Sequence, residues 1–258
     1  MTETKDNFSL TQTWVKVPQV TAIFWVIKLL STTVGESFAD YLSGTLKMGL
    51  IKTTILMSIL MIGFLSWQVL AKKYQPPLYW ITVVLVSIGG TLLTDTLTDK
   101  VGFPLIYSSA LFSIALVLVF ILWYQSENTI AMKSINSRKR EIYYWAAILM
   151  TFALGTATGD LVSEEIGLGY AKTALLVVGI IAGLVGLWKS KVLTGIAIFW
   201  PTYILTRPLG ASLGDFLTQP TKNGGINLGP TLVSFVFLII GVSLVTYLTI
   251  SKVDQIEE

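Results

Sequence analysis

Residues 145–160 read WAAILMTFALGTATGD, and the same pattern occurs three more times in this chain. The other copies are WVIKLLSTTVGESFAD (residues 25–40), WITVVLVSIGGTLLTD (residues 80–95) and WPTYILTRPLGASLGD (residues 200–215). Each copy begins with tryptophan, has a glycine ten residues later and ends with an aspartate fifteen residues after the tryptophan. Four ungapped matches at one spacing define an internal repeat, so the chain consists of four similar units.

The composition indicates that lipid surrounds most of this chain. Of its 258 residues, 53% are hydrophobic and 13% are charged, whereas soluble domains carry about 25% charged residues. Apolar runs of about 20 residues are long enough to cross a hydrocarbon core of roughly 30 Å. Such runs lie at about residues 20–40, 50–71, 78–96, 103–124, 143–161, 168–188, 193–214 and 228–250. We therefore predict an all-α polytopic membrane protein with eight transmembrane helices.

Each repeat contains two of these runs, so the chain returns to the same side of the membrane after every repeat. The repeats are therefore predicted to be parallel tandem helical hairpins, pseudo-symmetric about an axis near the membrane normal. A basic cytoplasmic linker, residues 126–142, separates the first half (18–125, repeats 1 and 2) from the second (143–250, repeats 3 and 4). The segments 1–17 and 251–258 are predicted to be cytoplasmic ends.

Lysines and arginines set the orientation, because basic loops stay in the cytoplasm. They are concentrated in the N-terminal segment, in the loops at 72–73, 133–140 and 189–191, and at Lys252. Both termini are therefore predicted to be cytoplasmic. The tryptophans fall toward the same side of the membrane, where we expect them to form an interfacial aromatic belt.

The tryptophan–glycine–aspartate hairpin, four times over and with LTRPLGASLGD at residues 205–215 in the last copy, resembles a family of bacterial inner-membrane proteins. These are uncharacterised membrane-anchored proteins made of four tandem two-helix repeats of unknown function. The resemblance covers about residues 16–250. It implies the eight-helix architecture and a location in the bacterial cytoplasmic membrane, but it implies no activity.

The glycines of the repeat predict close helix packing. Each stands four residues before another residue that is small in every copy, and such small-xxx-small steps let helices approach closely in lipid. The pairs are Gly35 with Ala39, Gly90 with Thr94, Gly155 with Gly159, and Gly210 with Gly214. An additional role in lining a pathway or permitting a helix break stays open.

The aspartates of the repeat are expensive in a membrane unless water, a partner or an ion compensates them. They are Asp40, Asp95, Asp160 and Asp215, and the residue four positions earlier on the same helix face is Glu36, Thr91, Thr156 or Ala211. If the four helices surround one axis, these side chains converge into a cation or proton site. Two alternatives stay open: helix caps hydrated in outer loops, and ion pairs with Lys52 and Lys172.

The side chains available as ligands limit which ions this site could bind. Cysteine and histidine are both absent from the sequence, which excludes disulfides, haem ligation by these residues and soft metal sites. Carboxylate and hydroxyl oxygens suit hard ions such as Mg²⁺, Mn²⁺, Ca²⁺, Na⁺ or H⁺. We accordingly predict a tentative metal site at the four aspartates and no cofactor.

Two basic residues fall well inside the predicted spans, away from their ends. We expect Lys28 to extend toward the cytoplasmic interface. Arg207 lies deeper and precedes Pro208, which cannot donate an amide hydrogen bond. Thr206–Arg207–Pro208 therefore marks a candidate broken or bent span, while an ion pair of Arg207 with Glu36 is the structural alternative.

These features favour a secondary transporter for a small hard cation such as Mn²⁺, Mg²⁺ or Na⁺, with proton coupling through the aspartates. The alternatives are a pseudo-fourfold cation channel and a structural or partner-binding membrane protein. An enzyme is not expected, because the chain lacks a nucleophile–histidine pair and a phosphate-binding glycine loop. The predicted partners are the lipid bilayer and a small cation or proton, without nucleic acid; a homo-oligomer stays open.

Overall fold

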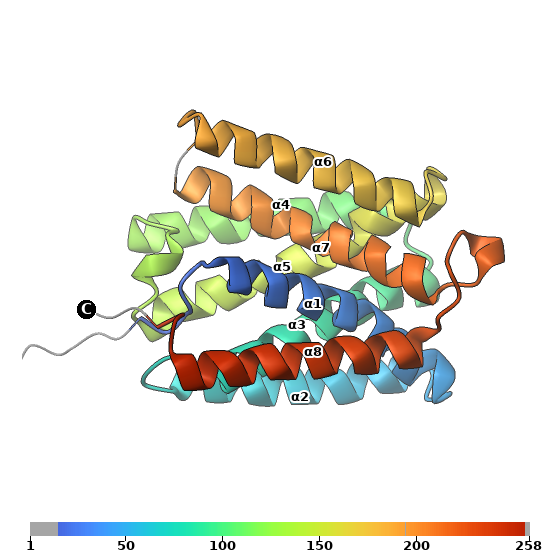
Figure 1. The fold of residues 1–258 in the computed structure, drawn as a ribbon, viewed down its shortest axis with the longest axis horizontal. Helices are drawn as coiled ribbons and strands as arrows, with labels where there is room; N and C mark the ends of the chain where they lie inside the picture. Colours follow the sequence, from blue (N-terminus) through green and yellow to red (C-terminus); the bar gives the residue numbers. More distant parts are fainter. Residues whose placement is uncertain (1–14, 194, 256–258) are drawn as a thin grey trace, which may run out of the picture.

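The computed structural model describes residues 15–193 and 195–255, and this part of the chain is helical with no β-strand. Its eight long helices run along the longest axis of the molecule (Figure 1). They are α1 (Ala22–Asp40), α2 (Leu50–Leu70), α3 (Pro76–Asp95), α4 (Leu105–Glu127), α5 (Arg138–Asp160), α6 (Tyr170–Lys189), α7 (Ile196–Thr218) and α8 (Pro230–Ser251). Their bounds follow the eight apolar runs, although α4 and α5 both extend into the predicted linker 126–142.

The first helix of each repeat belongs to a closed inner ring. Helix α1 packs against α3 and α7, and α5 packs against the same two helices from the other side. The four helices that carry the repeated aspartates are therefore gathered together rather than scattered around the periphery. We call α1, α3, α5 and α7 the inner helices, and α2, α4, α6 and α8 the outer helices.

The outer helices do not pack mainly against their own repeats, as a simple hairpin would. Helix α2 packs on α3, α4 on α5, α6 on α7, and α8 returns to pack on α1. In every repeat, contact with the next inner helix is more extensive than contact with the helix's own partner. The two helices of a repeat are thus splayed, and each repeat interlocks with the following one.

Large apolar side chains project from the outer helices into the surroundings of the molecule. Ile59 is 64% exposed on α2, Ile114 60% on α4, Leu175 70% on α6 and Ile239 66% on α8. Seven of the eight long helices in the described residues are long and apolar enough to cross a membrane. The exception is α7, an inner helix with polar residues and two internal prolines.

The inner helices of the first three repeats end in the same way. The α-helical part ends at the repeat's aspartate, and a π-helical turn follows it in each case. These turns are η1 (Tyr41–Thr45), η2 (Thr96–Lys100) and η4 (Leu161–Glu165). π-helical turns are rare and occur often at functional sites. Helix α7 differs, because it continues as an α-helix past Asp215 to Thr218.

The opposite end of the bundle, where α1 begins and α8 ends, is tied together by hydrogen bonds and is called the terminal end. The amide of Gln19 donates to the carbonyl of Asp254 at 2.8 Å. Lys16 forms a buried ion pair with Glu141 at the start of α5. Gln68, at the end of α2, also donates to Glu141, at 2.9 Å. Both ends of the described chain thus lie at the same end of the bundle.

Aromatic side chains fill the interior at the terminal end. Trp80, Trp145 and Trp200 are buried, and the hydroxyls of Tyr79 and Tyr144 are hydrogen-bonded to each other. The prediction of an interfacial belt is therefore wrong for these three tryptophans and for Trp123 on α4, which is also buried. Trp67 and Trp188, on outer helices, are exposed as that prediction required.

A pH-dependent contribution to stability is expected at Asp254. Burial raises the pKa of its carboxyl above the ordinary value of 3.8, and the hydrogen bond from Tyr74 offsets only part of that rise. Because the folded chain then holds this proton more tightly than the unfolded chain, the carboxyl destabilises the fold increasingly as pH rises above 3.8. Asp254→Asn should therefore gain stability relative to wild type from about pH 4 to neutral pH. The measurement is the unfolding midpoint of wild type and of Asp254→Asn at several pH values. If the two midpoints differ by the same amount at every pH, the prediction is wrong.

Candidate functional site

The repeated glycines bring the inner helices into contact at equivalent positions. Residues are numbered here by their distance from the tryptophan of their repeat, so the glycines occupy position 10. Each glycine faces the position 7 residue of the next repeat around the ring. The contacts are Gly35 with Ser87, Gly90 with Phe152, Gly155 with Arg207, and Gly210 with Thr32. A Cβ atom added at these glycines would lie 1.9 to 2.5 Å from the facing side chain, so any larger residue would clash.

The small residues at position 14 extend this close packing in the second half of the chain. A Cβ atom on Gly159 would lie 3.5 Å from the Cα of Pro208, and one on Gly214 would lie 3.3 Å from the Cβ of Glu36. These are ordinary or slightly tight contacts rather than clashes. Position 10 therefore sets the approach of the inner helices, and position 14 has somewhat more space.

Arg207, on α7, is fully buried at the centre of the ring. Its Nη2 donates to the carboxylate of Glu36 on α1 at 2.9 Å. The same nitrogen donates to the hydroxyl of Thr156 on α5 at 2.6 Å, and to that of Thr91 on α3. The expected ion pair of Arg207 with Glu36 is thus present, and the position 11 side chains of three repeats meet the arginine of the fourth. We call these four residues the Arg207 network.

Backbone carbonyls complete the surroundings of the guanidinium. Arg207 Nη1 donates to the carbonyl of Thr32 at 3.0 Å, and Nε donates to that of Phe152 at 3.4 Å. A buried charge is costly unless it is paired and hydrogen-bonded. Arginine suits this position because its five donors spread in a planar fork. All four inner helices are therefore joined through one side chain.

Thr91 and Thr156 lie on the predicted face, but their hydroxyl oxygens accept from Arg207 in this structure. They contribute to the Arg207 network. Helix α7 also runs unbroken through Thr206–Arg207–Pro208, so the span is not broken there. The helix tolerates Pro208 because α1 and α5 hold it on both sides through contacts to Arg207 and to Gly155.

Lys28 lies on the terminal side of the Arg207 network, and the expectation that it extends to the interface is wrong. The residue is 1% exposed, and its Nζ lies 4.0 Å from the ring centre of Phe152 and 4.3 Å from that of Tyr203. No hydrogen-bond acceptor faces this nitrogen among the described residues. The aromatic faces provide the attraction that holds it. Arg207 also lies near the Phe152 ring, at 5.7 Å, so two basic side chains occupy the middle of the ring.

The aspartates at position 15 lie at the other end of the ring, beyond the Arg207 network. Asp215 is 5% exposed, while Asp40, Asp95 and Asp160 are half-buried. Within the described residues, none of these carboxylates accepts a hydrogen bond or forms an ion pair. They stand at the same repeat position on the four inner helices, which pack together in the ring, and we call them the aspartate cluster.

The spacing within the aspartate cluster argues against direct chelation. In the part of the chain that the structure describes, no three acidic side chains lie close enough together to hold a metal ion. The tentative metal site at Asp40, Asp95, Asp160 and Asp215 thus has no support in this arrangement. The ring places one of these carboxylates on each inner helix.

Lys52 and Lys172 lie outside the candidate site. Both side chains are exposed near the starts of α2 and α6. Neither takes part in an ion pair among residues 15–193 and 195–255. The predicted pairing with the aspartates is wrong because these outer helices pack on the next repeat, where their basic residues face the surroundings.

Two sets of contacts in the structure could hardly be predicted from the sequence. The position 7 residues, on which the glycines pack, differ in every repeat: Thr32, Ser87, Phe152 and Arg207. The buried ion pair of Lys16 with Glu141 joins residues far apart in the chain. Its only signal is an acidic residue, Glu141, inside a basic segment.

Comparison with known proteins gives a family but no activity. A family described as "Repeat of Unknown Function (DUF347)" matches residues 23–74, 78–129, 143–191 and 198–254. Each match contains one inner helix and the outer helix that follows it. No curated protein and no solved structure was found to match the chain. Since the matches cover most of the sequence in four consecutive copies, the chain belongs to the family built from this repeat of unknown function.

Proposed function

We propose that this protein is an integral membrane transporter that carries a small hard cation through the aspartate cluster, in exchange for protons. In this proposal the outer helices face lipid, all eight long helices cross the membrane, and both termini are in the cytoplasm of a bacterium. The four repeats run parallel around a pseudo-fourfold axis near the membrane normal. The equivalent contacts from position 10 to position 7 support this symmetry, and the exposed apolar side chains of the outer helices support the lipid environment.

One observation carries the transport proposal. The aspartate cluster brings four carboxylates to one end of the ring, and the protein supplies none of them with a hydrogen-bond or ion-pair partner among its described residues. Arg207 is paired with Glu36 and forms no ion pair with any of these four carboxylates among the described residues. Carboxylates that share one end of the ring at low dielectric repel one another, which favours a bound cation or retained protons. Cation binding and proton release are therefore linked at this cluster.

The wide spacing of the carboxylates restricts how a cation binds there. A cation cannot be held by three of them at once, so it keeps part of its hydration shell. Mg²⁺ commonly binds in this way, through one or two carboxylates and several waters. We therefore propose a partly hydrated cation, with Mg²⁺ or Mn²⁺ as the first candidates and Na⁺ as the next.

The centre of the ring favours a transporter over a channel. A cation that leaves the aspartate cluster along the axis meets Arg207 and then Lys28, both buried and both cationic when protonated. The aromatic interior of the terminal end lies beyond them. A cation channel needs a continuous polar path with acidic or carbonyl ligands. A carrier instead moves its ion by rearranging helices around a fixed site, and no enzymatic step is required.

The transport proposal is tested in liposomes that contain the purified protein. Uptake of Mg²⁺, Mn²⁺, Ca²⁺ and Na⁺ is measured with and without an imposed pH gradient. We expect uptake of at least one of these ions to depend on the gradient. Asp95→Asn, Asp160→Asn and Asp215→Asn should each reduce it by about tenfold or more, because about 1.4 kcal/mol of lost binding free energy changes an affinity tenfold.

Glu165→Gln is the matched control, because Glu165 is an exposed carboxylate in the π-helical turn that follows Asp160. It should transport like wild type. The proposal fails if the wild-type protein moves none of the four cations under either condition. It also fails if the three aspartate variants transport as fast as Glu165→Gln, since the acids would then serve a structural or partner-binding role.

A further inference from the structure

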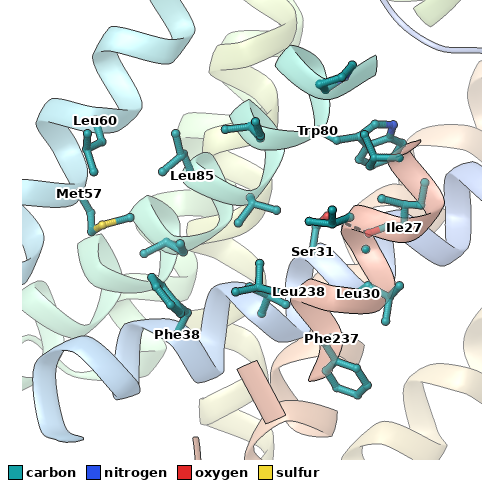
Figure 2. A pocket seen from close by; sticks show the side chains of 18 of the residues that line it. Ile27, Leu30, Ser31, Phe38, Met57, Leu60, Trp80, Leu85, Phe237 and Leu238 are labelled. Carbon is teal, nitrogen blue, oxygen red and sulfur yellow. Dashed lines mark hydrogen bonds between the residues drawn. The ribbon is translucent and has the colours of Figure 1, made fainter. Parts of the chain in front are cut away.

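An apolar crevice of about 570 Å³ lies on the side of the molecule between α2 and α8. Helices α1 and α3 provide its inner wall, and Figure 2 shows side chains from all four helices directed toward the shared space. It arises because α2 packs on α3 and α8 packs on α1, so these two outer helices flank the crevice without packing closely on each other. Its size lies within the range of roughly 300–1,000 Å³ found for ligand pockets.

The lining of this crevice offers almost no group for a polar ligand. Leucine, isoleucine, valine, phenylalanine and methionine side chains predominate. The hydroxyls of Ser31, Thr246 and Thr249 each donate to the carbonyl four residues earlier in their own helix, at 2.7 to 2.8 Å. The crevice is therefore suited to a hydrocarbon chain.

The crevice is also long in the direction of the helices. Its lining on the first repeat extends from Ile27 to Leu42, and at about 1.5 Å per residue this corresponds to roughly 22 Å. One leaflet of a bilayer contributes about 15 Å of hydrocarbon, half of a core of roughly 30 Å. An acyl chain of ordinary length that runs parallel to the helices therefore fits along it.

One end of the crevice lies at the terminal end of the bundle. Pro77 and Thr249 line it there, close to the start of α3 and the end of α8. The hydroxyl of Tyr74 donates to the carboxylate of Asp254. This bond holds the loop between α2 and α3 beside the segment that follows α8, directly past the end of the crevice.

Positive charge is concentrated on these two joined segments. Lys72 and Lys73 lie in the loop before α3, and Lys252 follows the last residue of α8; all three are exposed. Asp254 is the acidic residue nearest to Lys252 in the described sequence, but it is buried, and burial raises the pKa of its carboxyl. The mouth of the crevice is therefore basic, which complements an anionic headgroup.

We propose that this crevice is a specific site for an anionic phospholipid. One acyl chain lies in the crevice against α1 and α3, and the phosphate group lies at the terminal end beside Lys72, Lys73 and Lys252. The inference rests on the membrane location proposed above, but not on transport. The lipid comes from the surrounding bilayer leaflet on the side of the two termini.

The acyl-chain half of the site is tested by filling the crevice. Gly241 lines it from α8, and a Cβ atom there would have no neighbour within 4 Å, so Gly241→Phe adds a ring to the empty space without a clash. Gly183→Phe on α6 is the matched control, because it is equally unobstructed and lies outside the crevice. Phosphatidylglycerol binding to the detergent-solubilised protein is measured by native mass spectrometry. Gly241→Phe should lose one tightly bound lipid, and Gly183→Phe should keep it.

The headgroup part of the site is tested by removing its positive charges. Replacing Lys72, Lys73 or Lys252 by glutamine should weaken phosphatidylglycerol binding about fivefold for each lysine removed. Lys189→Gln, at the last residue of α6, and Lys191→Gln, in the loop that follows, are the controls and should have no effect. Wild-type protein should bind phosphatidylcholine much more weakly than phosphatidylglycerol, since its headgroup carries no net charge.

Three results would overturn the proposal. One is that Gly241→Phe binds as many phosphatidylglycerol molecules as wild type at equal affinity. Another is that the lysine variants lose no affinity. The third is that Gly241→Phe converts a wild-type dimer into a monomer with lipid binding unchanged, which would assign the crevice to a second copy of the chain. Because no ion gradient is used, failure of the transport proposal leaves these measurements unaffected.

Discussion

Replacing Arg207 by methionine is expected to lower the free energy of unfolding by about 3–5 kcal/mol, because the change leaves a buried carboxylate without its partner. Glu36 is 6% exposed and receives its direct ion-pair contact from Arg207 Nη2. The variant also loses the hydrogen bonds to the carbonyls of Thr32 and Phe152. Chemical unfolding in detergent, followed by tryptophan fluorescence, measures the loss.

The double variant Arg207→Met/Glu36→Met separates the unpaired charge from lost packing. Removing both charges should recover most of the stability, since a buried ion pair replaced by apolar groups is often neutral. Thr91 and Thr156 tolerate this, because their hydroxyls also bond to carbonyls of their own helices at 3.3 and 3.1 Å. If the single and double variants are equally destabilised, the charge pairing is not the reason for the loss.

A surface ion pair provides the control for this experiment. Lys139 lies 3.2 Å from Glu127, and the lysine side chain is 64% exposed. Lys139→Met should change the free energy of unfolding by about 0–1 kcal/mol, as exposed pairs generally do. A loss as large as that of Arg207→Met would show that the assay responds to any removal of charge.

Substitution of Gly90 should produce the second large effect. A Cβ atom on Gly90 would lie 2.5 Å from the Cβ of Phe152 and 3.1 Å from the backbone nitrogen of Ala153, on the adjacent helix α5. Neither atom can move unless the inner helices separate. Gly90→Ala is therefore expected to cost about 1–3 kcal/mol, the usual range for overpacking, and Gly90→Leu should cost more.

Gly186→Ala is the matched control for Gly90→Ala. Gly186 lies in α6, and no atom lies within 4 Å of a Cβ added there. Alanine favours the helix over glycine by up to about 1 kcal/mol, so this variant should be as stable as wild type or more so. Equal effects of the two substitutions on the unfolding midpoint would contradict the tight approach of α3 and α5.

Much of the architecture can be read from the sequence, because a repeated spacing is a strong constraint. The four aspartates share one position in the repeat. Because similar units are expected to pack in similar ways, the four helices that carry them are expected to lie together. The glycines at position 10 carry the packing signal, because a residue that is glycine in every copy indicates a close approach. The family resemblance is confirmed by the four consecutive matches.

The predictions that the structure contradicts concern contacts between different repeats. The pattern within one repeat carries no information about such contacts. Lys28 is buried because rings from α5 and α7 enclose its amine, and Phe152 and Tyr203 are more than a hundred residues away in the chain. Lys52 and Lys172 form no ion pair with the other described residues, because each outer helix packs on the following repeat. The distances between the aspartates depend on the width of the ring. α7 lacks the hydropathy of a span because it carries Arg207 and two prolines.

The cyclic order of helix packing has a consequence for synthesis of the chain. The outer side of α1 is covered by α8, so α1 leaves the ribosome well before the helix that covers it. Ser37 of α1, for example, receives its hydrogen bond from Ser234 only after α8 has been made. The packing of α1 is therefore completed late in the synthesis of the chain.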